Sequence, residues 1–245
     1  MMRQFPNALR LYDRALEITP KDLDVITVKA SIYQAEGNLQ QADSLLSEIN
    51  AESPIQPFIT KATQLRLERN HVEAVRLLQA RQAEFHFASP IDKAINQVIL
   101  AFAQHLAGDT AGAKAMAEEA QETLKPLCHD QPDNSFLAQQ LALANAAAGE
   151  KDAALAEAER AIKLLPSAKD PLSGPTREEV LALIQIMFAE TGRPISTLTK
   201  LLQTPYISWL YGPISVTPAL LRLDSVWDIL RGDPAFQKLC EEKQP

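Results

Sequence analysis

Cysteine, glycine, histidine and the aromatic residues are all scarce in this chain of 245 residues. The two cysteines are too few for a disulfide framework, and the eight glycines are scattered rather than grouped in a phosphate-binding loop. The four histidines lie far apart in the sequence, and no serine sits in the context of a hydrolase nucleophile. We therefore expect no metal, no cofactor and no enzyme activity within this chain.

Basic charge and long hydrophobic runs are also missing. The formal net charge is −7, which argues against a nucleic-acid surface because such a surface needs a basic stripe. The longest apolar run, Val180 to Ala189, is interrupted by Gln185 and is too short to span a bilayer. The first residues contain no signal-peptide core. These features favour a cytoplasmic location, although a membrane-spanning segment in a longer parent protein would place this region outside the cytoplasm.

Alanine and leucine dominate what is present, with 36 and 33 copies respectively. Both are strong helix formers, and no stretch alternates apolar and polar residues over the length of a strand. The hydrophobic fraction of 46% is enough for a sizeable core. The composition predicts an all-α protein of closely packed helices.

An internal repeat organises most of the chain. When Phe5–Pro20 is aligned with Leu39–Pro54, Ala8 falls on Ala42 and Tyr12 on Leu46, each 34 residues apart. A segment with a small residue, an aromatic residue and a turn glycine (Gly37) precedes the second copy. This pattern resembles the tetratricopeptide repeat (TPR), a helix–turn–helix unit. The resemblance implies an all-α fold, a right-handed α-α superhelix or TPR-like solenoid with a C-terminal capping segment.

The positions of glycine and proline agree with this repeat. Gly37, Gly108, Gly149 and Gly192 are expected on the turns inside the units, and prolines lie near the boundaries between units. The array is predicted over residues 1–205, with a C-terminal cap over 206–245. Its parts are a half repeat at 1–21 and units near 22–54, 55–88, 89–127, 134–166 and 175–205. The half repeat lacks a first helix, so we expect this chain to be a fragment of a longer array.

The C-terminal segment carries its own motifs. They are Leu221-Arg222-Leu223-Asp224, Trp227-Asp228, Leu230-Arg231 and Asp233-Pro234-Ala235-Phe236. They resemble the block that closes the TPR region of certain bacterial multidomain signalling proteins, which carry winged-helix, nucleotide-cyclase or Ser/Thr-kinase-like domains at their N-terminal end. Independently of any family, the apolar face that includes Trp227 and Phe236 is expected to cover the open end of the last unit.

Function is therefore expected to come from a surface. In TPR arrays the first helix of each unit lines a concave groove in which protein or peptide partners lie. The predicted groove residues are Gln34, Thr63, Arg66, Phe102, His105, Gln139 and Leu143. The expected role is a protein–protein interaction scaffold, or a regulatory or sensory arm of a larger bacterial signalling protein. The alternative is a self-assembly module that forms a homodimer of a kinase-, cyclase- or transcription-regulator-type parent.

The first prediction concerns the fold class. Circular dichroism should give a spectrum dominated by helix, because nothing in the sequence has the period of a strand. A strand content above about a fifth, the average for globular domains, would contradict the repeat assignment.

Overall fold

The computed structural model describes residues 4–241, and the terminal parts of the predicted half repeat (1–3) and cap (242–245) lie outside the described residues. Within this range the protein is all-α, with no strand and one isolated bridge between Ser208 and Gly212. The first helices are α1 (Phe5–Ile18), α2 (Leu23–Glu36), α3 (Leu39–Leu45), α4 (Ile55–Leu67), α5 (His71–Glu84), α6 (Pro90–Leu106) and α7 (Thr110–Asp130). They are followed by α8 (Ser135–Ala147), α9 (Lys151–Leu164), α10 (Gly174–Met187), α11 (Gly192–Leu201), α12 (Pro218–Leu223), the 3₁₀ helix η1 (Ser225–Leu230) and α13 (Pro234–Glu241).

Capping side chains fix where many of these helices begin. The residue before the helix accepts a hydrogen bond from a backbone N–H of the first turn, which would otherwise lack a partner. The capping residues are Asp22, Asn38, Asn70, Ser89, Asp109, Asn134 and Thr217. The local sequence thus sets the helix starts, and tertiary packing sets how the helices pair.

The turns inside the helix pairs mostly follow the glycine pattern. Gly37, Gly108 and Gly149 adopt positive φ angles of 83°, 81° and 84°, a conformation that costs a glycine little. In the other two pairs a non-glycine residue takes this place, Arg69 at 60° and Ala189 at 61°. The expectation for Gly192 is therefore wrong, because this residue begins α11 and the left-handed residue of its turn is Ala189.

Small residues bring the two helices of a pair close together. Ala30 on α2 and Ala42 on α3 are fully buried and share a cluster with Leu46. On α9, Ala154 has no exposed surface, and it belongs to the main hydrophobic core. A side chain no larger than a methyl group is what such a close approach allows. The anchors predicted from the repeat thus lie at the helix contacts.

The units differ in length because their helices do. Helix α7 has 21 residues, contains Pro126 and ends at Asp130. It therefore extends beyond residue 127, where the predicted unit ends. A nine-residue joint also separates α9 from α10. These two extensions, together with the 17-residue α6, make the later units longer than the first ones.

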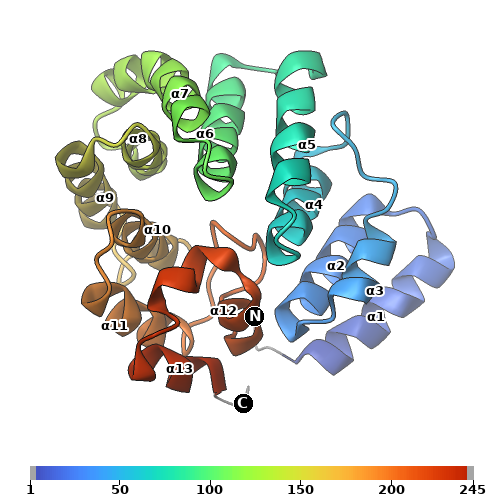
Figure 1. Ribbon diagram of the computed structural model, residues 1–245. Helices are drawn as coiled ribbons and strands as arrows, with labels where there is room; N and C mark the ends of the chain where they lie inside the picture. Colours follow the sequence, from blue (N-terminus) through green and yellow to red (C-terminus); the bar gives the residue numbers. More distant parts are fainter. Residues whose placement is uncertain (1–3, 242–245) are drawn as a thin grey trace.

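The helix pairs form a curved array that bends round on itself (Figure 1). Helices α2, α4, α6, α8 and α10 line the inside of the curve, and they also enclose a cavity there. Consecutive inner helices pack together in the pairs α2 with α4, α6 with α8, and α8 with α10. The predicted all-α superhelical array is confirmed, and its helix pairs are TPR-like. None of the helices within residues 4–241 is long and apolar enough to cross a membrane.

The C-terminal segment, residues 206–241, does more than the expected capping of the last unit. Its η1 packs on α10 and its α13 on α11, which covers the end of the array as expected. Its α12, however, packs against α2 of the first complete unit, and the Thr217 hydroxyl donates to the Ala35 carbonyl at 2.7 Å. The segment therefore connects the two ends of the array (Figure 1).

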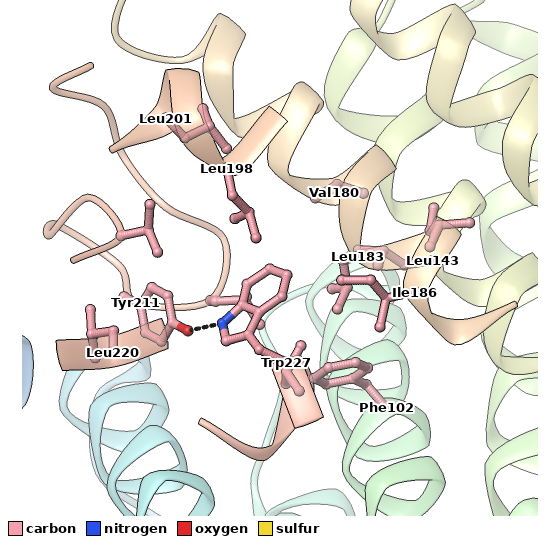
Figure 2. Packing of buried hydrophobic residues seen from close by; sticks show 14 of the residues in the cluster. Phe102, Leu143, Val180, Leu183, Ile186, Leu198, Leu201, Tyr211, Leu220 and Trp227 are labelled. Atoms are coloured by element: carbon pink, nitrogen blue, oxygen red, sulfur yellow. Dashed lines mark hydrogen bonds between the residues drawn. The ribbon is translucent and has the colours of Figure 1, made fainter. Parts of the chain in front are cut away.

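The main hydrophobic core lies where this segment meets the inner helices. Trp227 has no exposed surface and packs in one cluster with Leu183 and Ile186 of α10 and Phe102 of α6 (Figure 2). Burying a large side chain of this kind stabilises a fold by about 1.5–3 kcal/mol. The C-terminal segment is therefore part of the core.

The second prediction tests the register of the helix pairs. Replacing Ala154 with Leu should lower the free energy of unfolding by about 1–3 kcal/mol, because the larger side chain overpacks the contact between α8 and α9. The same substitution at Ala156, which is exposed on α9, should have little effect. Urea titration measures both, and equal losses would contradict the register.

Candidate binding cavity

A loop of the C-terminal segment, residues 206–213, is held against α10 by a buried carboxylate. Glu179 has no exposed surface and accepts hydrogen bonds from the Tyr206 hydroxyl at 2.8 Å, the Ser208 hydroxyl at 2.7 Å and the Trp209 backbone N–H at 2.7 Å. Burial raises the pKa of Glu179. These three donors fix the course of the loop over the first turns of α10.

The opposite side of the same loop is held by α4. The Leu210 carbonyl accepts from the Thr63 hydroxyl at 3.3 Å and from the Arg66 guanidinium at 2.9 Å. Arg66 also forms an ion pair with Asp224, with 3.1 Å between Nε and Oδ2. Asp224 has no exposed surface and Arg66 exposes only 13% of its side chain, so this ion pair is buried.

Asp224 is the acceptor at the end of a chain of hydrogen bonds. The Trp227 indole donates to the Tyr211 hydroxyl at 2.9 Å, and that hydroxyl donates to Asp224 at 3.0 Å (Figure 2 shows the first of these bonds). Burial, followed by the charge of Asp224, raises the pKa of Tyr211 well above its ordinary value. Tyr211 therefore stays protonated and serves as a fixed link between the core and the ion pair.

A second ion pair lies at the surface, between Arg69 in the turn that follows α4 and Asp228 in η1. Arg69 donates two hydrogen bonds to Asp228, at 2.6 and 2.7 Å, and about half of the Arg69 side chain is exposed. The hydrogen bond from Arg69 lowers the pKa of Asp228. Exposed pairs of this kind contribute little to stability, whereas removing one partner of a buried pair such as Arg66 and Asp224 is costly.

The inner helices and the 206–213 loop enclose a cavity of about 710 Å³, here called the inner cavity. Most of its lining is apolar, and residues from α2, α4, α5, α6, α8 and α10 contribute to it. On one wall Phe102 meets Trp209 edge to face, with 5.5 Å between the ring centroids. Cavities of this size and character are typical of binding sites for small ligands or short segments.

Among the charged residues of the lining, Arg177 is buried and forms no ion pair within residues 4–241, whereas Asp24 is exposed. Arg177, in the first turn of α10, is 8% exposed and donates to the Gln139 side chain at 2.6 Å and more weakly to the Ser135 hydroxyl at 3.4 Å. No carboxylate among residues 4–241 forms an ion pair with it, and its Nε has no acceptor. Burial lowers the pKa of Arg177.

Gln140 adds a second unpaired polar group to the same lining. Its side chain is 2% exposed, and its Oε1 has no hydrogen-bond partner within the described part of the chain. Gln139, which accepts from Arg177, and Gln140 both line the cavity from α8, so both groups without partners belong to the same cavity wall lining. Buried polar atoms without partners are uncommon, and a ligand is one explanation for them.

Four of the seven residues predicted for the groove line the inner cavity: Thr63, Arg66, Phe102 and Gln139. The other three lie elsewhere. Gln34 is buried and donates to the Thr60 carbonyl and the Gln64 side chain, and Leu143 is buried in the main core. His105 is half-buried, and burial lowers the pKa of its imidazole.

Several residues that line the cavity were not predicted from the sequence. They are Arg177, Gln140 and residues of the 206–213 loop, among them Trp209. Arg177 carried one readable signal, because a cation in the first turn of a helix opposes the helix dipole. In the structure a Cβ at Gly174 would lie 2.6 Å from the Ser167 backbone, so glycine permits a close approach at the start of α10. The loop carried no such signal, because its position depends on contacts far along the chain.

No group of three or more histidine, cysteine or carboxylate side chains within residues 4–241 is placed to bind a metal. Cys128 and Cys240 are both free and buried, and burial raises the pKa of each thiol. A raised pKa leaves a thiol protonated and unreactive at neutral pH.

Comparison with known proteins finds no matching family model and no matching curated protein. Among solved structures, the crystal structure of PilW, a type IV pilus biogenesis factor, matches with 16% sequence identity and a TM-score of 0.42. The match covers 81% of this chain and 85% of that chain. The helix pairs of this chain themselves define its helical-repeat fold.

The third prediction concerns the buried ion pair. Asp224→Asn should lower the free energy of unfolding by about 3–5 kcal/mol, because it leaves the Arg66 charge buried without a partner. Asp228→Asn is the matched control, since it removes the exposed pair with Arg69 and should cost about 0–1 kcal/mol. Urea titration of both variants gives the comparison, and similar losses would show that the buried pair does not hold the closure.

Proposed function

We propose that this chain is a non-enzymatic interaction scaffold that holds an apolar segment of a protein partner in the inner cavity. The observation that carries the proposal is the inner cavity. The C-terminal segment packs across the inside of the array, and this cavity remains beside it. A solenoid usually presents its inner helices to a partner. Here the inner helices of five pairs and the 206–213 loop present one bounded site instead of an open groove.

The chemistry of the lining supports a peptide-like occupant. Apolar side chains such as Ile59, Leu106 and Phe136 form most of the surface, and the polar groups are few. An apolar pocket with a few fixed polar groups favours a segment that buries side chains and aligns its backbone. The half-exposed Phe136 offers an aromatic contact of the kind that often dominates such recognition.

The finer parts of the expected role rest on the sequence alone. The motifs that begin at Leu221 and end at Phe236 support a place in a bacterial signalling protein, in which the scaffold serves as a regulatory or sensory arm. Self-assembly is the second candidate. It is favoured by two exposed apolar side chains of α1, Leu11 at 63% and Ile18 at 85%, and the molar mass in solution from light scattering decides whether a dimer forms.

The fourth prediction tests the site by filling it. Ala103 lies in the cavity lining on α6, so Ala103→Trp should place an indole in the space that a partner segment needs. A phage library of random peptides panned on the wild-type chain supplies the probe. Enriched peptides should bind Ala103→Trp at least about tenfold more weakly than wild type, as expected when a main contact is lost.

The control is Ala115→Trp, which adds the same side chain at an exposed position of the outer helix α7. This variant should bind the enriched peptides like the wild type, and both variants should keep the helical circular dichroism spectrum. Peptides that bind all three chains equally, or a library that yields no binder, would reject the inner cavity as the partner site.

A further inference from the structure

Arg177 is a buried cation whose surroundings do not neutralise it. Its bonding partners, the Gln139 amide and the Ser135 hydroxyl, are both neutral. The nearby carboxylate of Asp170 favours the charged form of Arg177 but makes no ion pair with it, and instead accepts from the backbone N–H groups of Leu172 and Ser173. A buried charge whose hydrogen-bond partners are all neutral is costly, and an anion that accepts directly from the guanidinium would offset part of that cost.

The other arginines inside the protein differ from Arg177 in their surroundings, although the Nε of Arg81, like that of Arg177, has no acceptor among the described residues. Arg66 has Asp224 as a counter-ion. Arg81, which is 1% exposed, donates to the carbonyls of Ala51 and Ser53 and stacks on the rings of Phe58 and Phe85, and it lies outside the cavity lining. Among the described residues, Arg177 is the arginine that lines the cavity without forming an ion pair and without stacking on an aromatic ring, although the Asp170 carboxylate lies near it.

Arg177 and Gln140 together specify more than an anion. A guanidinium has five N–H donors, and the two acceptors of Arg177 leave room for a carboxylate that would accept two parallel hydrogen bonds. The Gln140 Oε1 needs a donor, which a fatty-acid carboxylate lacks. A peptide offers both groups, because its backbone N–H groups donate and an acidic side chain accepts.

We propose that the partner segment carries an aspartate or glutamate whose carboxylate pairs with Arg177, while a backbone N–H of the same segment donates to Gln140. The inference rests on the proposed function, since it takes the inner cavity as the site of that segment. The apolar lining then binds the residues that flank the acidic one. The occupant is an apolar segment that contains one acidic residue. The positive charge of Arg177 distinguishes this segment from apolar segments without an acidic residue.

The experiment compares two selections from the same library of random peptides. The phage library is panned in parallel on the wild-type chain and on Arg177→Met, a substitution that keeps a long apolar side chain and removes the charge. Aspartate and glutamate should be enriched in the peptides selected by the wild type and not in those selected by Arg177→Met. Circular dichroism melting of Arg177→Met confirms that the variant compared is folded.

One enriched peptide then gives a double-mutant cycle by calorimetry. Replacing its acidic residue by the matching amide should weaken binding to the wild type at least about tenfold, as should Arg177→Met with the original peptide. The two changes together should cost little more than either alone, because they remove the same interaction. The peptide arm needs no variant of the protein, so it decides the question even where Arg177→Met folds poorly.

The failures of the two proposals are distinguishable. Peptides that lose binding to Ala103→Trp but show no acidic preference would overturn the role of Arg177 and leave the scaffold proposal standing. Additive effects in the cycle would have the same consequence. Peptides that bind Ala103→Trp as well as the wild type would overturn both proposals, because neither the inner cavity nor its arginine would then be the site.

Discussion

The buried ion pair between Arg66 and Asp224 is the interaction on which the rest of the architecture depends. It joins residues 158 positions apart, and the same Arg66 guanidinium also holds the Leu210 carbonyl. Asp224 accepts from Tyr211, which in turn accepts from Trp227, so one carboxylate links the inner face of α4 to the centre of the core. The fully buried charge of Asp224 is tolerated only where Arg66 and Tyr211 stay in place around it. Because Tyr211 and Asp224 belong to the C-terminal segment and Arg66 to α4, these contacts determine the course of that segment.

Closure changes the physics of a repeat array. In an open solenoid each unit contacts only its neighbours, so the ends fray and a partner can enter along the whole inner face. Here α12 packs on α2 while η1 packs on α10, which connects the first complete unit with the last. The same crossing divides the inner face into a filled part, where the core lies, and the inner cavity. The repeat thus supplies most of the cavity wall, and the closure supplies the 206–213 loop that bounds it.

The division between local and long-range information explains what the sequence could predict. Helix class, the turn glycines at Gly37, Gly108 and Gly149 and the small contact residues follow from short-range patterns, and the structure agrees with them. The cavity residues Thr63 and Phe102 were found because the groove face of a helix repeats regularly. The contact of α12 with α2 was not foreseeable, because the C-terminal segment has no repeat whose register could be transferred.

The interior arginines show how a protein of this kind separates structure from recognition. Arg66 and Arg81 are each surrounded by acceptors or rings that the chain itself supplies, so their charges serve the fold. Arg177 is held in place by Gln139 and Ser135, neutral partners that orient the guanidinium without cancelling its charge. An oriented and uncancelled charge in an apolar wall gains most when an anion arrives, because the low local dielectric strengthens the new pair. The apolar lining can then contribute affinity for many sequences, while the single arginine contributes the discrimination among them.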